Sequence, residues 1–379
     1  MRIGVFGGSF NPVHCQHLQI ARAAYASQKL DEIWFLPVFS PVHKDSGDFL
    51  SYEARRELLS IALRQHSNFY ICDAEKELGG PSYTVRTVKY LQKLYPENKF
   101  LLIIGGDSLA ELAFWRCVNE LVKMVEFIVA ERPGFERKIS VSMKEAKLHW
   151  VETGLSSVSS SQIRAELQSG RIPEKLVDPW VLYEILRKNY YGCLDKNYES
   201  LILEIDFVIN SLPDGLKEHI ENVARDSFLM ALENGVDPIS ALIAGLSHDL
   251  FRIADNEEIL RLASLSGYTL SSKELELPML AHGAASAGFL KKLWPEIPVQ
   301  ILDAVRFHTL PENNMGDLAK ILVIADALEA SRKIGEREKL RQKKLDLGKK
   351  FELVVELKKN AAEQKKKVGS FVNSQHIQA

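Results

Sequence analysis

The sequence predicts a doubly wound α/β domain with a parallel sheet, followed by an all-α domain. Up to about residue 190, short apolar runs alternate with amphipathic helical patterns. From about Asn197 onward the strand signals vanish and the apolar spacing is helical. The length of 379 residues exceeds that of an ordinary single domain, so each half can bury a core of its own.

The apolar runs of the first half are nearly continuous, as expected for strands that a parallel sheet buries on both faces. We expect strands at Ile3–Phe6, Ile33–Leu36, Phe69–Cys72, Phe100–Ile104 and Val125–Val129. The patterns between them predict helices such as Tyr52–His66 and Tyr83–Leu94. Ligands of such folds bind beyond the carboxyl ends of the strands. The blocks that follow predicted strands, and are therefore candidates for a site, are Gly7–His17, Leu36–Lys44 and Gly105–Asp107.

The second half begins after a boundary expected at residues 192–200, where a short polar stretch follows Gly192. Its core helices are expected at Asp237–Asp249, Pro298–His308 and Asp317–Ser331, with a loop starting at Pro311. Beyond Gly335, lysine, arginine and glutamate interleave, which is typical of a solvated helix, and the last dozen residues are expected to be disordered. A nucleic-acid arm at Lys365-Lys366-Lys367 is the less favoured alternative. The expected domains are 1–192, 197–335 and a charged tail at 336–379.

Charge and cysteine content limit the class of protein. The formal net charge of -2 gives no general reason to expect nucleic acid or an acidic membrane surface as partner, so any phosphate binding must be local. The four cysteines are scattered without a Cys-x-x-Cys pair, as expected for reduced thiols. No apolar run reaches membrane-spanning length and no export signal is recognisable at the start. We therefore expect a cytoplasmic protein, and the sequence leaves a homo-oligomer open.

The segment from Arg2 to His17 predicts a phosphate-binding turn. Gly7 and Gly8 follow the first strand and let a backbone approach a ligand, and the next helix begins with unpaired N–H groups that favour an anion. His14 and His17 are three residues apart and share one helix face. Exposed histidines after an ordinary strand-to-helix turn are the alternative interpretation.

A second anion site is predicted near Arg164. Ser159, Ser160 and Ser161 precede an apolar helical pattern, so a serine lies where an N-cap belongs and free amides point outward. An ordinary serine cap is the alternative. Imidazole and guanidinium donors suit the stabilisation of negative charge on phosphate oxygens.

These features resemble those of the nucleotidyltransferases with a His-x-x-His signature, most closely the bacterial nicotinate mononucleotide adenylyltransferases. The blocks that carry the resemblance, in order after the glycine turn, are Leu36-Pro-Val-Phe-Ser-Pro-Val-His43-Lys44, Tyr83-Thr84-Val-Arg-Thr87, Ile104-Gly-Gly-Asp107-Ser-Leu with Trp115, and Ser159-Ser-Ser-Gln-Ile-Arg164. The resemblance implies transfer of AMP from ATP to nicotinate mononucleotide, with magnesium bridging the triphosphate.

The resemblance also implies roles for individual residues. Catalysis is implied for His14, His17 and Arg164. The further residues implied to bind ATP are Gly7, Gly8, Ser9, Phe10, Lys44, Asp107 and Ser160, with Asp107 toward the ribose. Thr84 is implied to bind the nicotinate carboxylate and Trp115 to stack on the pyridine ring. Apart from the resemblance, Trp115 would be expected in the core, and Lys44 fits a solvated lysine nearly as well.

The sequence departs from the family pattern at two positions. Gln16 stands where the family has glycine between the histidines, and Val42 stands in place of a second proline. A side chain at position 16 could crowd the phosphate or the contact between helix and strand. We expect this departure to affect the rate rather than the type of reaction.

The helical half carries histidines and carboxylates in unusual surroundings. Asp326 falls on an otherwise apolar helix, where an unpaired carboxylate is costly and a metal would relieve that cost. The pair His248-Asp249 ends a strongly apolar segment, and His219, His282 and His308 are the other histidines of this region. Histidines that are satisfied within their helices are the alternative.

This ordered set resembles the HD superfamily of metal phosphohydrolases, most closely the bacterial symmetrical diadenosine tetraphosphatases. By that resemblance His219, His248, Asp249 and Asp326 hold one ion, with Asp249 also counted as catalytic. His282 and His308 hold a second ion or contact phosphate. The implied metal is iron or another divalent transition metal, and the implied reaction is hydrolysis of diadenosine tetraphosphate to ADP. Cleavage of another nucleotide, or a noncatalytic nucleotide sensor that regulates the transferase, are the alternatives.

Overall fold

The chain divides into two compact units, Met1–Cys193 and Leu194–Ala379. The computed structural model describes residues 1–40, 49–131, 145–154, 158–312, 314–329 and 335–360. The expectations for His43, Lys44, Val42 and Lys365-Lys366-Lys367 lie outside these residues. Among the described residues, no helix is both long and apolar enough to cross a membrane.

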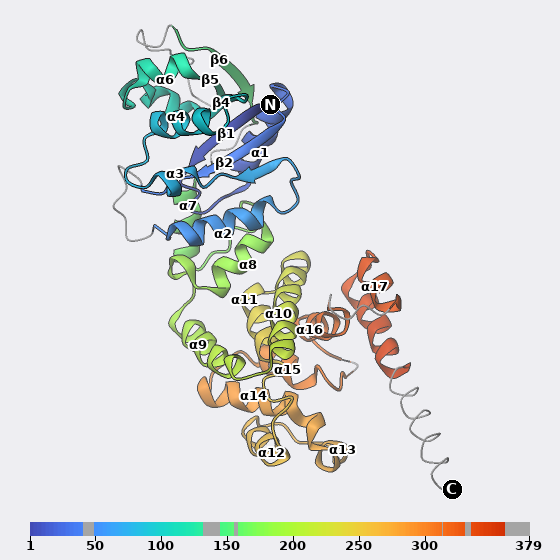
Figure 1. The fold of residues 1–379 in the computed structure, drawn as a ribbon. Helices are drawn as coiled ribbons and strands as arrows, with labels where there is room; N and C mark the ends of the chain where they lie inside the picture. The colour runs from blue at the N-terminus through green and yellow to red at the C-terminus, as the bar shows by residue number, and fades with distance from the viewer. Residues whose placement is uncertain (41–48, 132–144, 155–157, 313, 330–334, 361–379) are drawn as a thin grey trace, which may run out of the picture. The chain divides into compact units, whose positions relative to one another are not determined.

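The first unit is built on a six-stranded sheet in the order β3-β2-β1-β4-β5-β6, and all neighbouring strands are parallel (Figure 1). The strands are β1 Arg2–Gly8, β2 Glu32–Pro37, β3 Phe69–Ile71, β4 Lys99–Gly105, β5 Glu126–Glu131 and β6 Leu148–Glu152. Five of them lie where the apolar runs predict strands. The sixth, β6, is only half-buried at the edge of the sheet, so its sequence lacks a continuous apolar run.

Helices cover both faces of this sheet, with α4 and α6 on one side and α1 on the other (Figure 1). Their bounds are α1 Cys15–Ser27, α2 Tyr52–Leu63, α3 Ala74–Leu78, α4 Thr84–Leu94, α5 Gly106–Glu111, η1 Leu112–Phe114, α6 Val118–Met124, α7 Ser160–Gln168, α8 Pro179–Arg187 and η3 Tyr190–Gly192. Side-chain caps start several of them: Ser51 accepts from the amide of Ala54, and Ser159 accepts from the amide of Gln162.

The second unit is all-helical over its described residues. Its helices are α9 Lys196–Asn210, α10 Asp214–Asn234, α11 Pro238–Ser247, α12 Asn256–Leu265, α13 Ser272–Glu276, η4 Pro278–Ala281, α14 His282–Leu293, α15 Val299–Phe307, α16 Asp317–Leu328 and α17 Gly335–Gln342. Almost every residue of α11 and α16 is buried, as their apolar sequences predict. The prediction of a doubly wound α/β unit followed by an all-α unit is confirmed.

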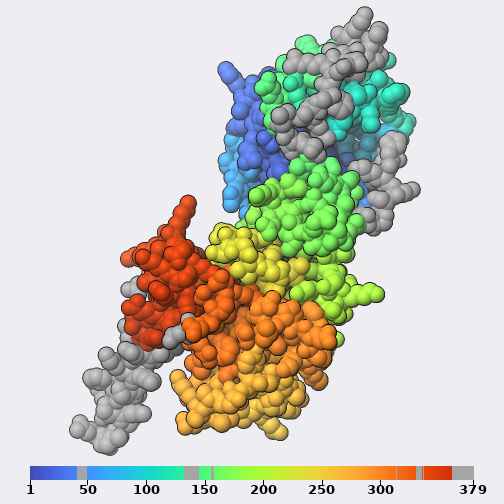
Figure 2. Space-filling model, turned by 180° about the vertical axis from the view of Figure 1, so that it is seen from behind, coloured from blue at the N-terminus to red at the C-terminus, as the bar shows by residue number. Residues whose placement is uncertain are grey.

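The charged segment after Gly335 packs more closely than a solvated helix. It contains α17 and a second helix at 347–360, and Figure 2 shows its red surface against the orange surface of the preceding helices. Leu340, Phe351 and Val354 are buried. The apolar residues within the charged sequence therefore attach this segment to the second unit.

Candidate functional sites

The order of the sheet reverses between β1 and β4, and the first candidate site lies there. β1 ends at Gly8 and β4 at Gly105, with Asp107 in the first turn of α5. A Cβ atom added at Gly105 would collide with the carboxylate of Asp107, so glycine at this position leaves room for that side chain. Ligands of doubly wound sheets bind in the crevice at such a reversal. The fold thus brings two distant predicted blocks to one edge of the sheet.

Packing fixes the conformation of the glycine turn. Phe10 is buried with φ of +46°, a left-handed conformation that is unusual for a bulky residue. A Cβ atom at Gly8 would lie 3.1 Å from the ring of Phe10, and that ring meets the imidazole of His17 edge-on at 5.0 Å. Gly7 is exposed and Ser9 is partly exposed. The turn therefore presents its backbone outward while Phe10 anchors it.

The two histidines form a close pair with tilted rings at the start of α1. His14 is the buried N-cap residue, and its backbone N–H donates to Nδ1 of His17 at 3.2 Å. The two ring centroids are 3.8 Å apart. Because Nδ1 of His17 accepts a hydrogen bond, the neutral ring carries its proton on Nε2. His17 is partly exposed, so it can donate this N–H to a ligand oxygen.

Two residues of α7 join the same turn. The Ser160 hydroxyl donates to the carbonyl of Pro12 at 3.0 Å, and Nη1 of Arg164 donates to the carbonyl of Asn11 at 2.8 Å. Arg164 also donates to the Ser161 hydroxyl at 3.4 Å. The structure thus brings the serine-rich helix start to the histidine pair, although more than 140 residues of sequence separate them.

The residues predicted for the second substrate lie in neighbouring segments. Thr84 is the first residue of α4, and Trp115 directly follows η1 and packs half-buried against the core. The guanidinium of Arg116 lies 4.6 Å from the ring centroid of Tyr83, which connects the two segments. The residues next to Thr84 and Trp115 in sequence are therefore in contact.

Gln16 is directed away from the histidine face. It is buried between α1 and the end of β6, and its Nε2 lies 3.5 Å from the hydroxyl of Thr153, which itself donates to the carbonyl of Glu131. Within the described part of the chain, its Oε1 has no hydrogen-bond partner. Of the two effects expected from this side chain, crowding of the helix–strand contact fits its position, and crowding of the phosphate does not.

Sequence reasoning missed Arg55, a buried residue of α2 that supports the turn. Its guanidinium donates to three carbonyls: Ser9 at 2.8 Å, Val38 at 2.6 Å and Leu50 at 3.1 Å. It also lies 4.5 Å from the ring centroid of Phe49. An arginine on the apolar face of the Tyr52–Leu63 pattern is the sequence signal that could have identified it.

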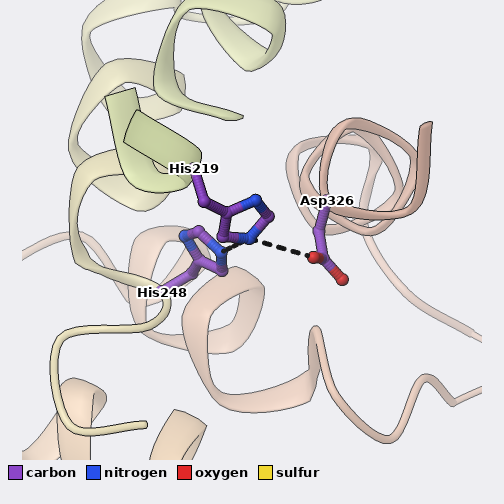
Figure 3. A group of neighbouring side chains, drawn as sticks. All are labelled: His219, His248 and Asp326. Carbon is purple, nitrogen blue, oxygen red and sulfur yellow. Dashed lines mark hydrogen bonds and ion pairs between the residues drawn. The ribbon is translucent and has the colours of Figure 1, made fainter. Parts of the chain in front are cut away.

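In the second unit the structure brings all six predicted metal ligands into one cluster. His219 comes from α10 and Asp326 from α16, while the other four lie at helix ends: His248, Asp249, His282 and His308. All six are buried. Figure 3 shows the imidazoles of His219 and His248 facing each other and the carboxylate of Asp326 facing His219.

Backbone carbonyls orient three of these imidazoles. Nδ1 of His248 bonds to the carbonyl of Gly245 at 2.8 Å, and Nδ1 of His282 and of His308 each bond to the carbonyl three residues earlier at 2.7 Å. An Nδ1–H donated to a carbonyl leaves the lone pair on Nε2, the form that binds a metal. The Nε2 atoms of His282 and His308 are 3.2 Å apart, and those of His219 and His248 are 3.4 Å apart.

Asp249 divides the cluster into two halves. Its Oδ2 lies 3.5 Å from Nε2 of both His219 and His248, and its Oδ1 lies 3.0 Å from His282 and 3.3 Å from His308. Asp326 joins the first half, with Oδ1 at 3.5 Å from Nε2 of His219. Each carboxylate oxygen of Asp249 thus faces one pair of imidazoles.

The separations within the cluster fit a transition metal. An ion with bonds of about 2.1 Å spaces its ligands about 3.0 Å apart in octahedral and about 3.4 Å apart in tetrahedral geometry. The observed separations between ligand atoms run from 3.0 to 3.5 Å. A mixed imidazole and carboxylate set suits divalent iron, manganese or zinc. The residues therefore fit one or two such ions.

The electrostatics of the cluster favour bound positive charge. Burial alone would lower the pKa of His219, but the carboxylates of Asp249 and Asp326 raise it to about 9. Burial would raise the pKa of Asp249, yet the neighbouring histidines hold it well below its usual range. Burial lowers the pKa of His308 to about 4. Asp249 thus stays ionised and attracts a cation.

Further residues contact this cluster without having been predicted as functional. Glu329 is fully buried and lies 3.2 Å from Nδ1 of His219, the position of a carboxylate that orients a metal-binding imidazole. Its place three residues after Asp326 is a signal that could have found it. The Thr309 hydroxyl lies 3.0 Å from Nε2 of His282. Arg252 donates to Asp249 at 2.7 Å.

Both units match known protein families. The model of the cytidylyltransferase-like family matches residues 5–166, and the model of the HD domain matches residues 216–331. A protein of Shouchella clausii named "Probable nicotinate-nucleotide adenylyltransferase" is 39% identical over 191 residues, which cover 50% of this chain and 97% of the relative. Its counterpart in Geobacillus thermodenitrificans is 36% identical over 191 residues, covering 50% of this chain and 86% of the relative.

Two solved structures are each similar to about half of the chain. The nicotinic acid mononucleotide adenylyltransferase of Plasmodium falciparum, complexed with NaAD, is 21% identical with a TM-score of 0.46 and covers 51% of this chain and 98% of its own. A predicted HD superfamily hydrolase involved in NAD metabolism from Clostridium acetobutylicum is 26% identical with a TM-score of 0.40, covering 45% of this chain and 88% of its own. From the sequence relatives and the two family models, the chain belongs through half of its length to the nicotinate-nucleotide adenylyltransferase family, and it also contains an HD domain.

Proposed function

We propose that the first unit transfers the adenylyl group of ATP to nicotinate mononucleotide, giving deamido-NAD and pyrophosphate in NAD biosynthesis. The relatives that match this unit over most of their length bear the name of that activity. The observation that carries the proposal is the close pair of His14 and His17 on the glycine turn, at the reversal of the sheet. This arrangement directs an N–H donor to the edge where nucleotides bind in such folds.

The proposed reaction needs positioning and charge stabilisation. A phosphate oxygen of nicotinate mononucleotide attacks the α-phosphorus of ATP, and the bond to the pyrophosphate oxygen breaks. Nε2–H of His17 donates to a phosphate oxygen as negative charge develops there, and His14 and Arg164 add donors beside it. Magnesium bound to the triphosphate would neutralise part of the charge on the departing pyrophosphate.

The remaining predicted residues bind the nucleoside parts of ATP and nicotinate mononucleotide. The exposed carboxylate of Asp107 accepts hydrogen bonds from the ribose hydroxyls of ATP. Thr84, at the start of α4, donates to the carboxylate of nicotinate, and Trp115 offers its ring face to the pyridine. An anion held at this helix start favours nicotinate over the neutral nicotinamide. The proposed role of Lys44 in closing on phosphate lies outside the described residues.

Product analysis tests this activity. Purified full-length protein is incubated with ATP, magnesium and either nicotinate or nicotinamide mononucleotide, and the dinucleotide and pyrophosphate are quantified by chromatography. We expect equal amounts of deamido-NAD and pyrophosphate, and faster turnover of the nicotinate form. His66→Asn changes a histidine stacked on Phe69 outside the site and serves as control for substitutions at His17. Absence of product from folded protein would refute the proposal.

We further propose that the HD domain hydrolyses diadenosine tetraphosphate to ADP. Asp249 supports this proposal, because its two oxygens each face one pair of imidazoles and so offer a bridge between two ions. Two such ions would activate a water molecule for attack on phosphorus and neutralise the leaving ADP. The hydroxyl of Thr309 and the guanidinium of Arg252 are donors beside this cluster that can orient phosphate oxygens.

A panel of nucleotides tests the hydrolase. The protein is loaded with iron(II) under argon and given diadenosine tetraphosphate, an alarmone or a cyclic nucleotide in separate reactions. ADP as the sole product of diadenosine tetraphosphate, at a rate above those of the other substrates, is the expected result. Cleavage of another nucleotide alone would replace the proposed substrate. Tight nucleotide binding without turnover would instead favour a sensor that regulates the transferase.

A further inference from the structure

The segment after residue 331 lies beyond the match to the HD domain, yet it reaches the metal-binding cluster. In the helix at 347–360, Phe351 and Val354 are buried, and Lys358 lies on the same face because residues three, four and seven apart share a helix face. Nζ of Lys358 donates to Oδ2 of Asp326 at 2.9 Å and to the carbonyl of His308 at 3.2 Å. The packing of Phe351 and Val354 thus places the ammonium of Lys358 at the metal-binding cluster.

A second cationic side chain, Arg252, pairs with Asp249, the other carboxylate of the cluster. Arg252 donates to Asp249 at 2.7 Å, as Lys358 does to Asp326 at 2.9 Å, so each carboxylate of the cluster has a cationic partner. Both cations are partly exposed, with 47% of the Arg252 side chain and 22% of the Lys358 side chain accessible. They lie where the buried cluster meets solvent.

Divalent ions bound to Asp249 and Asp326 would change the net charge of the cluster. Asp326 faces His219 with Oδ1 and Lys358 with Oδ2, so a ligand atom remains on the metal side while the ammonium stays on the other. With Asp249 and Asp326 neutralised by metal, the positive charges of Arg252 and Lys358 lack compensation, and an anion then binds favourably between them and the ions. Lys358 has three N–H groups, of which the described contacts use two.

We propose that Lys358 is an anion-binding residue of the HD site and donates to a phosphate oxygen of the substrate. This inference rests on the proposal that the HD site binds a phosphorylated substrate. It gives the charged segment at 336–360 a role in the site. A purely structural ion pair between Lys358 and Asp326 is the competing explanation, and it predicts effects on stability and metal content instead of phosphate affinity.

Phosphate binding can be observed at this site alone. The full chain is loaded with manganese(II), freed of excess ion, and titrated with inorganic phosphate while the broadening of the phosphorus resonance is recorded, because only phosphate near the ion is broadened. The substitutions are Lys358→Met, Lys358→Gln and Lys358→Arg. Glutamine retains N–H donors for Asp326 without the charge, so it keeps the test valid if methionine impairs folding. The exposed neighbour supplies the control Lys359→Met.

We expect wild-type protein to bind phosphate saturably and Lys358→Met and Lys358→Gln to bind it about tenfold more weakly or worse, as for loss of one charge-assisted hydrogen bond. Lys358→Arg and Lys359→Met are expected to resemble wild type, and all variants to retain the same manganese content by electron paramagnetic resonance. Wild-type affinity in Lys358→Gln, or loss of manganese from it, would overturn the inference. Absence of broadening in manganese-loaded wild type would also refute phosphate binding by the HD site itself.

Discussion

Replacing Arg55 by methionine tests how the phosphate-binding turn is held. The substitution removes hydrogen bonds to the carbonyls of Ser9, Val38 and Leu50, which belong to three segments around the turn. A hydrogen bond from a charged donor contributes about 1.5 kcal/mol or more, and a carbonyl left unpaired in the interior adds a desolvation cost. Methionine fills much of the same space, so the cavity contribution is small.

The expected loss is about 4 kcal/mol in the free energy of unfolding of the first unit, which corresponds to a decrease in Tm of about 10 °C for a unit of this size. Because the turn carries Ser9, we also expect a higher KM for ATP. Arg55 is only 1% exposed, so solvent screening does not reduce this estimate.

Tryptophan fluorescence during urea unfolding measures this loss selectively. Trp34, Trp115, Trp150 and Trp180 lie in the first unit, and only Trp294 of the five tryptophans lies in the second. Arg56→Met is the matched control, because the Arg56 side chain is 44% exposed, pairs with Asp73 near the surface and should contribute below about 1 kcal/mol. An unfolding free energy of Arg55→Met within about 1 kcal/mol of wild type would refute the reasoning.

The other predictions concern both sites and the sheet. Gln16→Gly should change kcat less than about threefold yet destabilise the first unit by about 1 kcal/mol or more, measured by turnover and urea unfolding, because this side chain packs away from the histidines. His17→Asn retains an acceptor for the His14 amide but loses the Nε2–H donor, so we expect a fall in kcat of about a hundredfold with unchanged circular dichroism. Asp249→Asn should abolish binding of the second equivalent of manganese(II) and weaken the first, as measured by metal analysis after dialysis. Hydrogen bonds from Lys99 and His149 lower the pKa of Glu126 to about 2. Ionised Glu126 therefore stabilises the fold above its unfolded pKa, and this stabilisation is lost as the pH falls toward 2. We expect the Tm of Glu126→Gln to lie below that of wild type at pH 6 and to equal it at the acid end.

The fold class was predictable because strands and helices that are buried on all sides have nearly continuous apolar sequences. β1, β2, β4 and β5 are nearly continuous apolar runs, and α11 and α16 are almost entirely apolar. β6 has no such run, because Leu148–Glu152 packs along only one edge and its residues are half-buried. The described part of the charged tail is helical, and its buried Phe351 and Val354 show that isolated apolar residues among charges carry packing information.

The candidate sites were predictable where chemistry is concentrated in short segments. The glycine turn with His14 and His17, and the pair His248-Asp249, are readable from spacing together with a family resemblance. Arg55 was marked only by its place on an apolar helix face. Lys358 carried no signal, since its role depends on Asp326, which is 32 residues away in sequence. The position of Gln16 was likewise not decidable from sequence, because the two expected forms of crowding differ only in the direction of the side chain.

The sequence by itself determined the alternation of strands and helices, the change to an all-α unit, and which side chains are able to bind phosphate or metal, because periodicity and residue chemistry are local properties. Only the tertiary structure decided which of these groups meet. The reversal of the sheet between β1 and β4 brings the glycine turn to Asp107, and helix packing turns four imidazoles toward Asp249. These contacts depend on long-range packing. Packing fixes the direction of each side chain and brings together atoms of residues that are far apart in the sequence.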